Sequence, residues 1–233
     1  MGRHLPNGTD DTVDLPNLTS PVFVHTDLMW CLDDSRNFGH AAERTLDALR
    51  QYDAFIVPTF TYSWRLGGMD FTKDTPSEIG LFSEYSRQRL PYRTDHPVFS
   101  ISSNKQWDVG PAAFGQRSIF EQLHRNDGTI LFLGCGFQQC TFVHYIEQCF
   151  GVDYRYYRTY AGLVNGRRRV VSGYVRNTDR GVVTKLDLAE EYMLKQGTLK
   201  REGRLMYGSS SAIFDDITRL LSYDKYYLVR FEK

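Results

Sequence analysis

A strand, a helix and a second strand follow one another in the first quarter of the chain, and this order constrains the fold most. Residues 22–25 and 54–59 are short apolar runs, which are typical of buried strands. Between them, Ala42, Leu46 and Leu49 recur at the i, i+4, i+7 spacing of one buried helix face. Two strands joined by a helix of this length form a right-handed parallel crossover. The sequence therefore predicts an α/β protein in its first part.

Polar residues follow both predicted strands. His25, Thr26 and Asp27 end the first strand, and Thr59 and Thr61 end the second. In open α/β sheets, ligands bind outside the carboxyl ends of the strands. We therefore expect both polar clusters on a single rim that forms a binding site.

The segment after the second strand adds further candidates. Residues 75–78, Thr-Pro-Ser-Glu, predict the start of a helix that runs to about residue 89, with proline in its first turn. Glu84 lies off the apolar side of this helix, so it is either solvated or turned toward a cleft. Pro97 holds His96 in an extended conformation before a strand at 98–103. A single histidine is more often structural than catalytic, so the neighbours of His96 carry its candidacy.

The remainder of the chain mixes helices and strands. Its Asn165-Gly166 pair predicts a hairpin turn between two strands. The arginines and tyrosines of this hairpin suit phosphate or RNA binding, but solvated strand faces around a half-buried aromatic row are the simpler interpretation. The further elements that we expect are helices at 118–125, 141–150, 187–196 and 211–222, and strands at 129–134, 154–160, 167–175 and 226–231.

Charge, cysteines and hydropathy narrow the classes of partner. Lys plus Arg equals Asp plus Glu at 28 each, so no global field draws the protein to a nucleic acid. The four cysteines lack the paired spacing of a metal site, which predicts free thiols and no bound metal. No run approaches the roughly 18 apolar residues of a membrane span, and the first residues lack the apolar stretch of a secretion signal. We therefore expect a cytoplasmic protein without membrane or nucleic-acid partners.

The expected domain organisation is simple. Residues 1–20 are polar and aperiodic, which predicts a flexible N-terminal arm. Residues 21–233 then form a single domain, because a chain of this length favours one compact core. We expect an α/β part at 21–150 and an α+β part at 151–233.

Six short motifs follow one another within about ninety residues. They are PTFTYS (58–63), TPSEIGLFSEYSR (75–87), RTDHPVFS (93–100), FGQRS (114–118), DGTILFLGCGF (127–137) and TFVHYIE (141–147). Each motif is weak, but their order is specific. In this order they resemble the aminoglycoside 3-N-acetyltransferase family, and the likeness covers roughly residues 20–160.

The resemblance implies a fold, a reaction and site residues. The fold is a mixed central sheet flanked by helices, and the reaction moves an acetyl group from acetyl-coenzyme A to a primary amine of an amino sugar. The residues implied for coenzyme A are His25, Thr26, Asp27, Ser100, Ser102 and Ser103. The residues implied for catalysis are His96, Glu84 and Asp108. The residues implied for the acceptor are Thr59, Thr61, Tyr62 and His144.

This reaction needs a base. An amine attacks a thioester only in its neutral form, and a histidine, whose pKa is normally about 6.5, suits the proton transfer and typically contributes roughly 10²–10⁴-fold in rate. We expect His96 as the base, with Glu84 orienting it. Thr61, Ser100 or a backbone N–H would donate to the oxyanion. Direct attack in a ternary complex then requires no cysteine nucleophile.

One departure from the family pattern leaves alternatives open. Family members usually carry a longer segment after the His-Pro strand, with a histidine often assigned as the base, whereas residues 104–113 contain none. Because the chain is neutral, we favour a singly charged, nucleotide-linked amino sugar whose diphosphate meets the arginines and tyrosines of 154–169. The alternatives are an aminoglycoside-modifying resistance enzyme and a non-catalytic coenzyme A-binding or interaction module. A homodimer is compatible with each.

Overall fold

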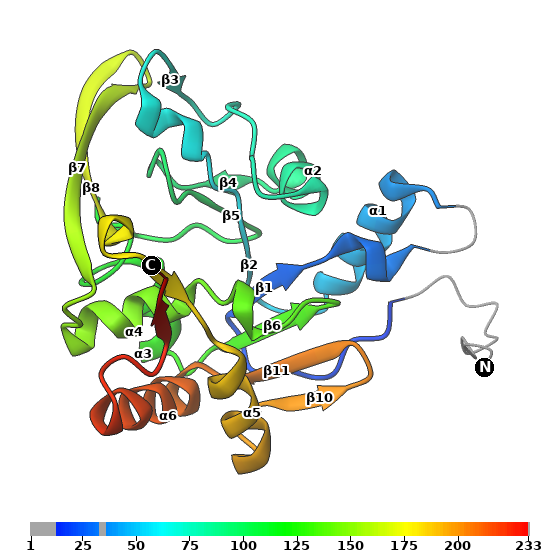
Figure 1. Ribbon diagram of the computed structural model, residues 1–233. Helices are drawn as coiled ribbons and strands as arrows, with labels where there is room; N and C mark the ends of the chain where they lie inside the picture. Colours follow the sequence, from blue (N-terminus) through cyan, green and yellow to red (C-terminus); the bar gives the residue numbers. More distant parts are fainter. Residues whose placement is uncertain (1–12, 33–35, 233) are drawn as a thin grey trace.

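The computed structural model describes residues 13–32 and 36–232. At its centre lies a seven-stranded mixed sheet with the strand order β10-β11-β6-β1-β2-β5-β4 (Figure 1). Its strands are β1 (Val22–Thr26), β2 (Phe55–Pro58), β4 (Tyr92–Arg93), β5 (Ile101–Ser103), β6 (Thr129–Leu133), β10 (Lys200–Glu202) and β11 (Leu205–Ser209). The α-helices are α1 (Phe38–Leu49), α2 (Leu81–Arg89), α3 (Ile119–Arg125), α4 (Phe142–Phe150), α5 (Asp187–Gln196) and α6 (Ser210–Tyr223).

The parallel crossover predicted from the sequence is present. The helix α1 connects β1 to β2, and these strands pair in parallel with Val22 opposite Phe55. The strand β1 also pairs in parallel with β6, so the three strands bring their carboxyl ends to one edge. The strands β5 and β11 are antiparallel to their neighbours β2 and β6. The sheet is therefore mixed, as expected.

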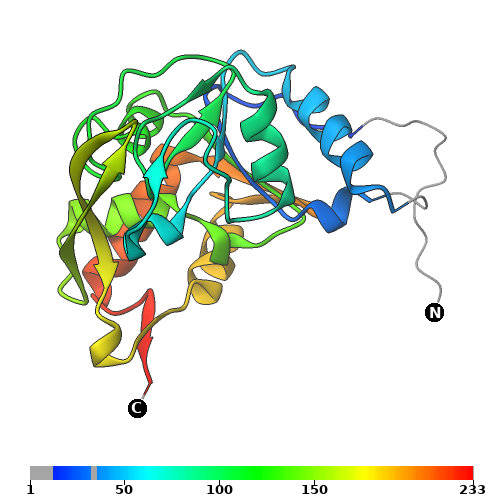
Figure 2. The same ribbon diagram turned by 90° about the horizontal axis from the view of Figure 1, so that it is seen from above.

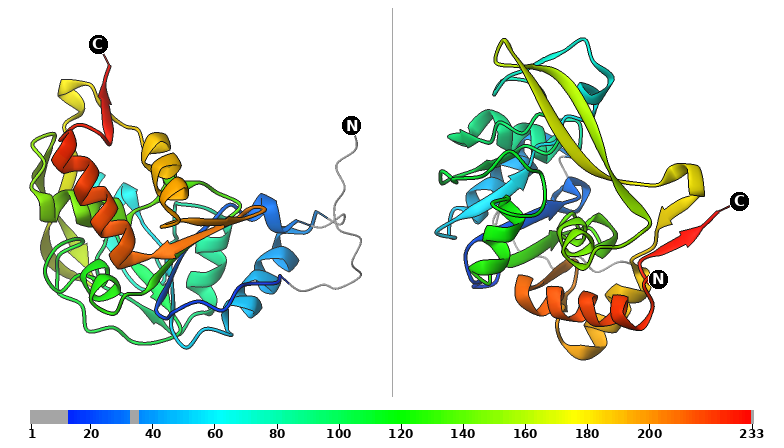
Figure 3. Two further views of the ribbon diagram at one scale, coloured as in Figure 1. Left: turned by 90° about the horizontal axis from the view of Figure 1, so that it is seen from below. Right: turned by 90° about the vertical axis from the view of Figure 1, so that its left-hand side faces the viewer.

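Side chains alternate between the two faces of the sheet, and each face has its own core. Val22 and Val24 of β1 pack with α1 and with Phe82 of α2. Phe23 of the same strand packs on the opposite side, in a core shared with α3, α4, α5 and α6. Figures 2 and 3 show these helical layers on either side of the sheet. Helices thus cover both faces, and the carboxyl edge of the parallel strands is left for a ligand.

A long β-hairpin, formed by β7 (Arg155–Val164) and β8 (Arg167–Arg176), stands beside the sheet as a curved wall (Figure 1). Its two strands pair along their full length. Asn165 and Gly166 form the turn with φ angles of 51° and 72°, a backbone conformation that asparagine and glycine tolerate. The hairpin predicted from these two residues is confirmed.

The tip of the hairpin is anchored to the segment that follows β2. This segment forms the short helix η2 (Tyr62–Leu66), whose Trp64 is 1% exposed. The Trp64 indole donates to the carbonyl of Leu163 at 2.9 Å, and the ring packs against Gly162. The short strand β3 (Asp70–Phe71) adds parallel pairing to β7. The hairpin is therefore held at its tip by both aromatic packing and hydrogen bonds.

The structure differs from the expected elements in several places. The helix α2 begins at Leu81 and not near residue 75: residues 75–80 are irregular, and the Glu84 carboxylate accepts from the backbone N–H of Ser77. The strands β10 and β11 were not expected, yet β11 joins the main sheet beside β6. The strands β9 (Val182–Thr184) and β12 (Val229–Phe231) form a separate antiparallel pair.

Part of the expected N-terminal arm packs on the domain. Leu15 is buried, and Tyr52 donates to the carbonyl of Pro16 at 2.7 Å. The first twelve residues of that arm lie outside the described residues. Within the described part of the chain, no helix has the length and apolar content to cross a membrane.

The contact between Gly162 and Trp64 predicts a destabilising substitution. A Cβ at position 162 would lie 2.7 Å from the Trp64 ring, and the buried ring has no space to move away. Gly162→Ala should lower the free energy of unfolding by about 1–3 kcal/mol, measured by urea denaturation. Ala161→Ser, one residue away and exposed, is the control and should stay within about 0.5 kcal/mol of the parent. Equal stability of both variants would contradict this packing.

Candidate active site

A cavity of about 860 Å³ opens at the carboxyl ends of β1 and β2. The helix α4 and the hairpin bound its other sides. Five of the residues expected at the site line it together, namely His25, Thr26, Asp27, Tyr62 and His144. Of the two polar clusters predicted at strand ends, His25, Thr26 and Asp27 line this cavity, whereas Thr59 and Thr61 do not, and the hairpin closes it from the opposite side.

A buried carboxylate stands at the centre of this site. Glu147 is 0% exposed and lies one helical turn after His144 on α4, so the two side chains share a helix face. Its Oε2 lies 3.0 Å from Nδ1 of His144 and 2.6 Å from Nε of Arg155. The Tyr154 hydroxyl donates to its Oε1 at 2.9 Å. Every polar atom of the carboxylate thus has a partner, as a buried charge requires.

These contacts set the protonation of the cluster. Burial alone would raise the pKa of Glu147, but Arg155, His144 and Tyr154 together hold it below its usual range. Burial, followed by the charge of Arg155, lowers the pKa of His144 below 6.5 against the opposing effect of Glu147. The imidazole is therefore neutral at neutral pH. Nδ1 of His144 lies 3.0 Å from the Glu147 carboxylate and 2.9 Å from Nη2 of Arg155, and it is the tautomer with the proton on Nδ1, donated to Glu147, that leaves the Nε2 lone pair free to accept a proton.

Arg155 also lies close to the imidazole itself. Its Nη2 is 2.9 Å from Nδ1 of His144, and its Nη1 donates to the carbonyl of Tyr174 at 3.3 Å. The guanidinium thus joins α4 to both strands of the hairpin. Burial and the charge of Arg155 together outweigh the effect of Glu147, which alone would raise the pKa of the histidine.

His25 has a different role from His144. Its Nε2 accepts from the backbone N–H of Thr141 at 3.3 Å, and its ring stacks on Phe132. Burial, with a smaller contribution from His144, lowers its pKa to about 3. His25 is therefore a neutral residue that holds the start of α4 beside the sheet.

The rim keeps one hydroxyl without a partner. Among the described residues, none bonds to the buried Oγ1 of Thr26, which lies on the cavity. Asp27 instead caps η1 (Leu28–Cys31) by accepting from the N–H of Met29. Burial raises the pKa of the cavity thiols Cys135 and Cys140 to about 12, so neither is a thiolate at neutral pH. The rim offers hydrogen bonds and no reactive nucleophile.

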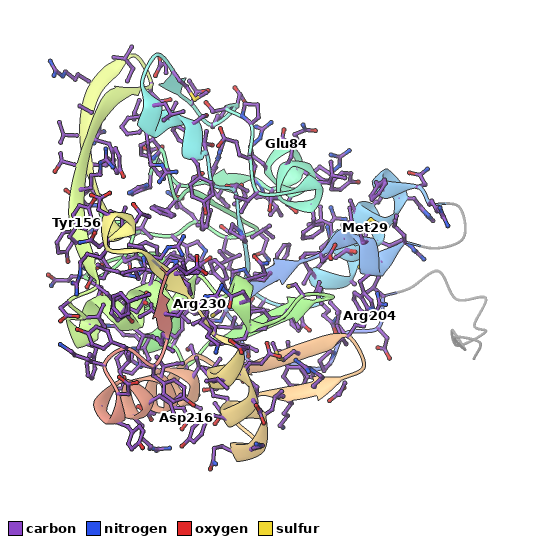
Figure 4. The ribbon with its side chains drawn as sticks, viewed as in Figure 1. Met29, Glu84, Tyr156, Arg204, Asp216 and Arg230 are labelled. Carbon is purple, nitrogen blue, oxygen red and sulfur yellow. The ribbon has the colours of Figure 1, made fainter. Side chains whose placement is uncertain are left out.

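The structure places Glu84 apart from this cavity. It forms an ion pair with Arg87 at 2.7 Å and accepts from Ser77 and Gln88. The hydrogen bonds from Arg87 lower its pKa to about 2, despite the opposing effect of burial. Figure 4 shows Glu84 on α2, well separated from Tyr156 of the hairpin wall. Its contacts stabilise α2 and the turn before it.

His96 and Asp108 lie on a second cavity, of about 1050 Å³. Nδ1 of His96 accepts from the backbone N–H groups of Val98 and Phe99 at 3.2 and 3.0 Å, and burial lowers its pKa to about 4. Asp108 is exposed and pairs with Arg117 at 3.0 Å. The structure thus brings neither Glu84 nor Asp108 into contact with His96.

The serines and threonines expected at the site form an internal scaffold. Ser100 donates to the carbonyl of Thr59 at 2.7 Å, and the Arg93 guanidinium donates to the same carbonyl and to Thr61. Ser102 donates to the Thr59 hydroxyl, also inside the protein. The buried members of this group, none of which lines the first cavity, are Thr59, Thr61, Ser100, Ser102 and Ser103.

Sequence reasoning missed Glu147, Tyr154 and Arg155. The sequence did contain a signal for Glu147, because it lies three residues after His144 within the motif TFVHYIE and so shares a helix face with it. The partners Tyr154 and Arg155 follow the helix and meet it only through the fold. No sequence pattern marks that contact.

Comparisons with known proteins identify the family of this chain. The family model described as aminoglycoside 3-N-acetyltransferase matches residues 50–222. The chain belongs to this family. No curated protein sequence matches it. As expected from the motifs, this family member is an acetyl-coenzyme A-dependent N-acetyltransferase.

Solved structures share the fold at low identity. The enzyme AAC(3)-IIb is 16% identical, with a TM-score of 0.70 over 87% of this chain and 90% of that one. AAC-IIIb, solved as a binary complex with CoASH, is 15% identical, with a TM-score of 0.68 over 88% and 91%. AAC(3)-IVa is 19% identical, with a TM-score of 0.66 over 89% and 83%. These likenesses confirm the mixed α/β fold of the family member.

The buried ion pair predicts a large stability difference. Arg155→Met leaves the Glu147 carboxylate without its cation and should lower the free energy of unfolding by about 3–5 kcal/mol, whereas adding Glu147→Gln should recover much of that loss. The control Asp108→Asn removes an exposed pair and should change stability by less than about 1 kcal/mol. Denaturant unfolding measures all four proteins. A similar effect of Arg155→Met and Asp108→Asn would contradict the buried pair.

The lowered histidine pKa values predict loss of stability in mild acid. The unfolded chain protonates His25 and His96 near pH 6.5, whereas the folded chain does so only near their pKa values of about 3 and about 4. The unfolded state therefore binds more protons as the pH falls below about 6.5, and each histidine should cost about 1.4 kcal/mol per pH unit. His25→Gln, which still accepts from Thr141, should reduce this slope. Equal unfolding free energies at about pH 7 and pH 5 would refute the assignment.

Proposed function

We propose that the protein acetylates a primary amine of an amino sugar, with acetyl-coenzyme A as the donor and His144 as the general base. The observation that supports this assignment is the pairing of His144 with buried Glu147 on the wall of the cavity. A histidine whose Nδ1–H faces a carboxylate keeps the tautomer that accepts a proton at Nε2. Family membership supplies the reaction class.

The proton follows a short route in this scheme. The neutral amine attacks the thioester carbonyl carbon, and a C–N bond forms while one N–H proton passes to Nε2 of His144. The C–S bond then breaks, and the departing thiolate takes a proton to give free coenzyme A and the acetamide. Glu147 stabilises the transient imidazolium through Nδ1–H, while Arg155 and Tyr154 keep the carboxylate fixed.

His144 suits the role of base better than His96. Because Nδ1 of His96 already accepts two backbone N–H groups, the proton of its neutral ring is on Nε2. That nitrogen is then a donor and has no lone pair to offer. The first cavity also joins His144 to the strand-end rim, whereas His96 opens on a different cavity.

The rim is proposed to hold the coenzyme. Thr26 lines the cavity, and its buried hydroxyl, which has no partner among the described residues, suits a hydrogen bond to an amide group of a pantetheine arm. The relative AAC-IIIb is solved with CoASH, and AAC(3)-IVa is solved with a gentamicin and with apramycin. These complexes support a coenzyme A donor and an amino-sugar acceptor here.

The assignment of the base predicts a kinetic loss. His144→Asn should lower kcat by roughly 10²–10⁴-fold, measured as thiol release with a panel of amino sugars. The variant should still bind coenzyme A, which at 100 times its Kd stabilises a protein by about 2.7 kcal/mol in thermal unfolding. Asp108→Asn is the control and should keep its activity.

Two other results would change the assignment. Unchanged turnover of His144→Asn would reject this histidine as the base. A wild-type protein that is stabilised by coenzyme A but releases thiol with no amine would instead be the non-catalytic binding module.

A further inference from the structure

The walls of the first cavity carry an excess of positive charge. Among the described residues that line it, the arginines are Arg65, Arg155, Arg158 and Arg176, and the one carboxylate is Asp27. Arg155 is compensated by Glu147, which lies behind it. Three arginines thus face one aspartate, although the whole chain has a net charge of zero.

The three remaining arginines keep most of their donors available. No ion pair joins Arg65, Arg158 or Arg176 to a carboxylate within residues 13–32 and 36–232. Arg158 lies 5.7 Å from the Tyr160 ring centre, and Arg65 lies 5.1 Å from that of Tyr62. Each guanidinium has five N–H donors in a planar fork that matches phosphate or carboxylate oxygens. These side chains are therefore suited to hold an anion.

Two of the arginines stand on the hairpin beside the proposed base. Arg176 of β8 is directly opposite Arg155 of β7, which contacts His144. Because cross-strand partners share a face of the hairpin, an anion held by Arg176 lies beside Arg155 and the proposed base. Arg158 follows three residues after Arg155 on β7, so it starts from the other face of the strand, and it lines the same cavity.

Coenzyme A does not explain this position. Its phosphates are separated from the thioester by the whole pantetheine arm, so they lie far from the base when the acetyl carbon is beside it. An anionic group near His144 must therefore come from the acceptor.

We propose that the acceptor is an amino sugar bearing a phosphate, which Arg176 holds beside His144 in a cavity that Arg158 also lines. This inference rests on the function proposed above and names its substrate class. A polycationic aminoglycoside meets repulsion from the same wall. The site thus differs in charge from what the gentamicin and apramycin ligands of AAC(3)-IVa require.

The test compares acceptors and wall variants. The wild type, Arg158→Ala and Arg176→Ala are assayed for thiol release with glucosamine, glucosamine 1-phosphate and gentamicin. The wild type should prefer glucosamine 1-phosphate, and each variant should raise its KM about tenfold or more without changing the KM for glucosamine. Arg168→Ala, on an exposed hairpin residue that lines neither cavity, is the matched control and should behave as wild type.

Two kinetic outcomes overturn the inference while leaving the proposed function intact. The first is a wild type that acetylates gentamicin more efficiently than glucosamine 1-phosphate. The second is a rise in the KM for acetyl-coenzyme A in the variants, with no such rise for phosphate-free acetyl-pantetheine, which would assign the arginines to the phosphates of the donor.

A binding measurement separates the inference from catalysis. If no amine is acetylated, the proposed function fails, but thermal unfolding still reports on the wall. Stabilisation of the wild type by glucosamine 1-phosphate and not by glucosamine, lost in Arg158→Ala and Arg176→Ala, supports the anion site. Absence of this difference overturns it.

Discussion

The buried carboxylate of Glu147 is the interaction on which the site depends. A carboxylate without solvent is stable only where cations and hydrogen bonds surround it, and here Arg155, Tyr154 and His144 do so. Two of these partners lie at the start of the hairpin and one lies on α4. The same ion pair therefore positions the imidazole and fixes the base of the cavity wall to the helix.

The hairpin is held at its far end by a different kind of contact. Trp64 is packed against Gly162 and donates to the Leu163 carbonyl, and β3 pairs with the end of β7, so the tip is fixed by close packing and hydrogen bonds. Because the hairpin is fixed both at its tip and at its start, it has little freedom to move relative to the sheet. The space between the hairpin and the strand-end rim is thus a preformed cavity, and the cost of ordering a loop on binding is avoided.

Sequence patterns predicted the elements whose signals are local. The parallel crossover, the Asn165-Gly166 hairpin and the helix carrying His144 follow from periodicity and turn chemistry. The start of α2 could not be predicted in this way, because it depends on a hydrogen bond from Ser77 to a side chain seven residues away. The site residues were more difficult to predict than the elements. Glu84 and Glu147 are both acidic residues on helices, and only the long-range packing of Arg155 against α4 determines that Glu147 is the buried one.

The zero net charge of the chain conceals the positive charge of this cavity. Equal numbers of acidic and basic residues suggested a neutral surface without a field, yet among the residues that the structure describes, three arginines without an ion pair line one cavity together with a single aspartate. Charges within a partly enclosed, low-dielectric site act more strongly than the same charges on an open surface. Under the proposal above, the choice of acceptor depends on the charge of the hairpin side chains that line the cavity. The His144–Glu147 pair lies on the helix beside the hairpin, so these side chains can differ in charge while the proposed base stays unchanged.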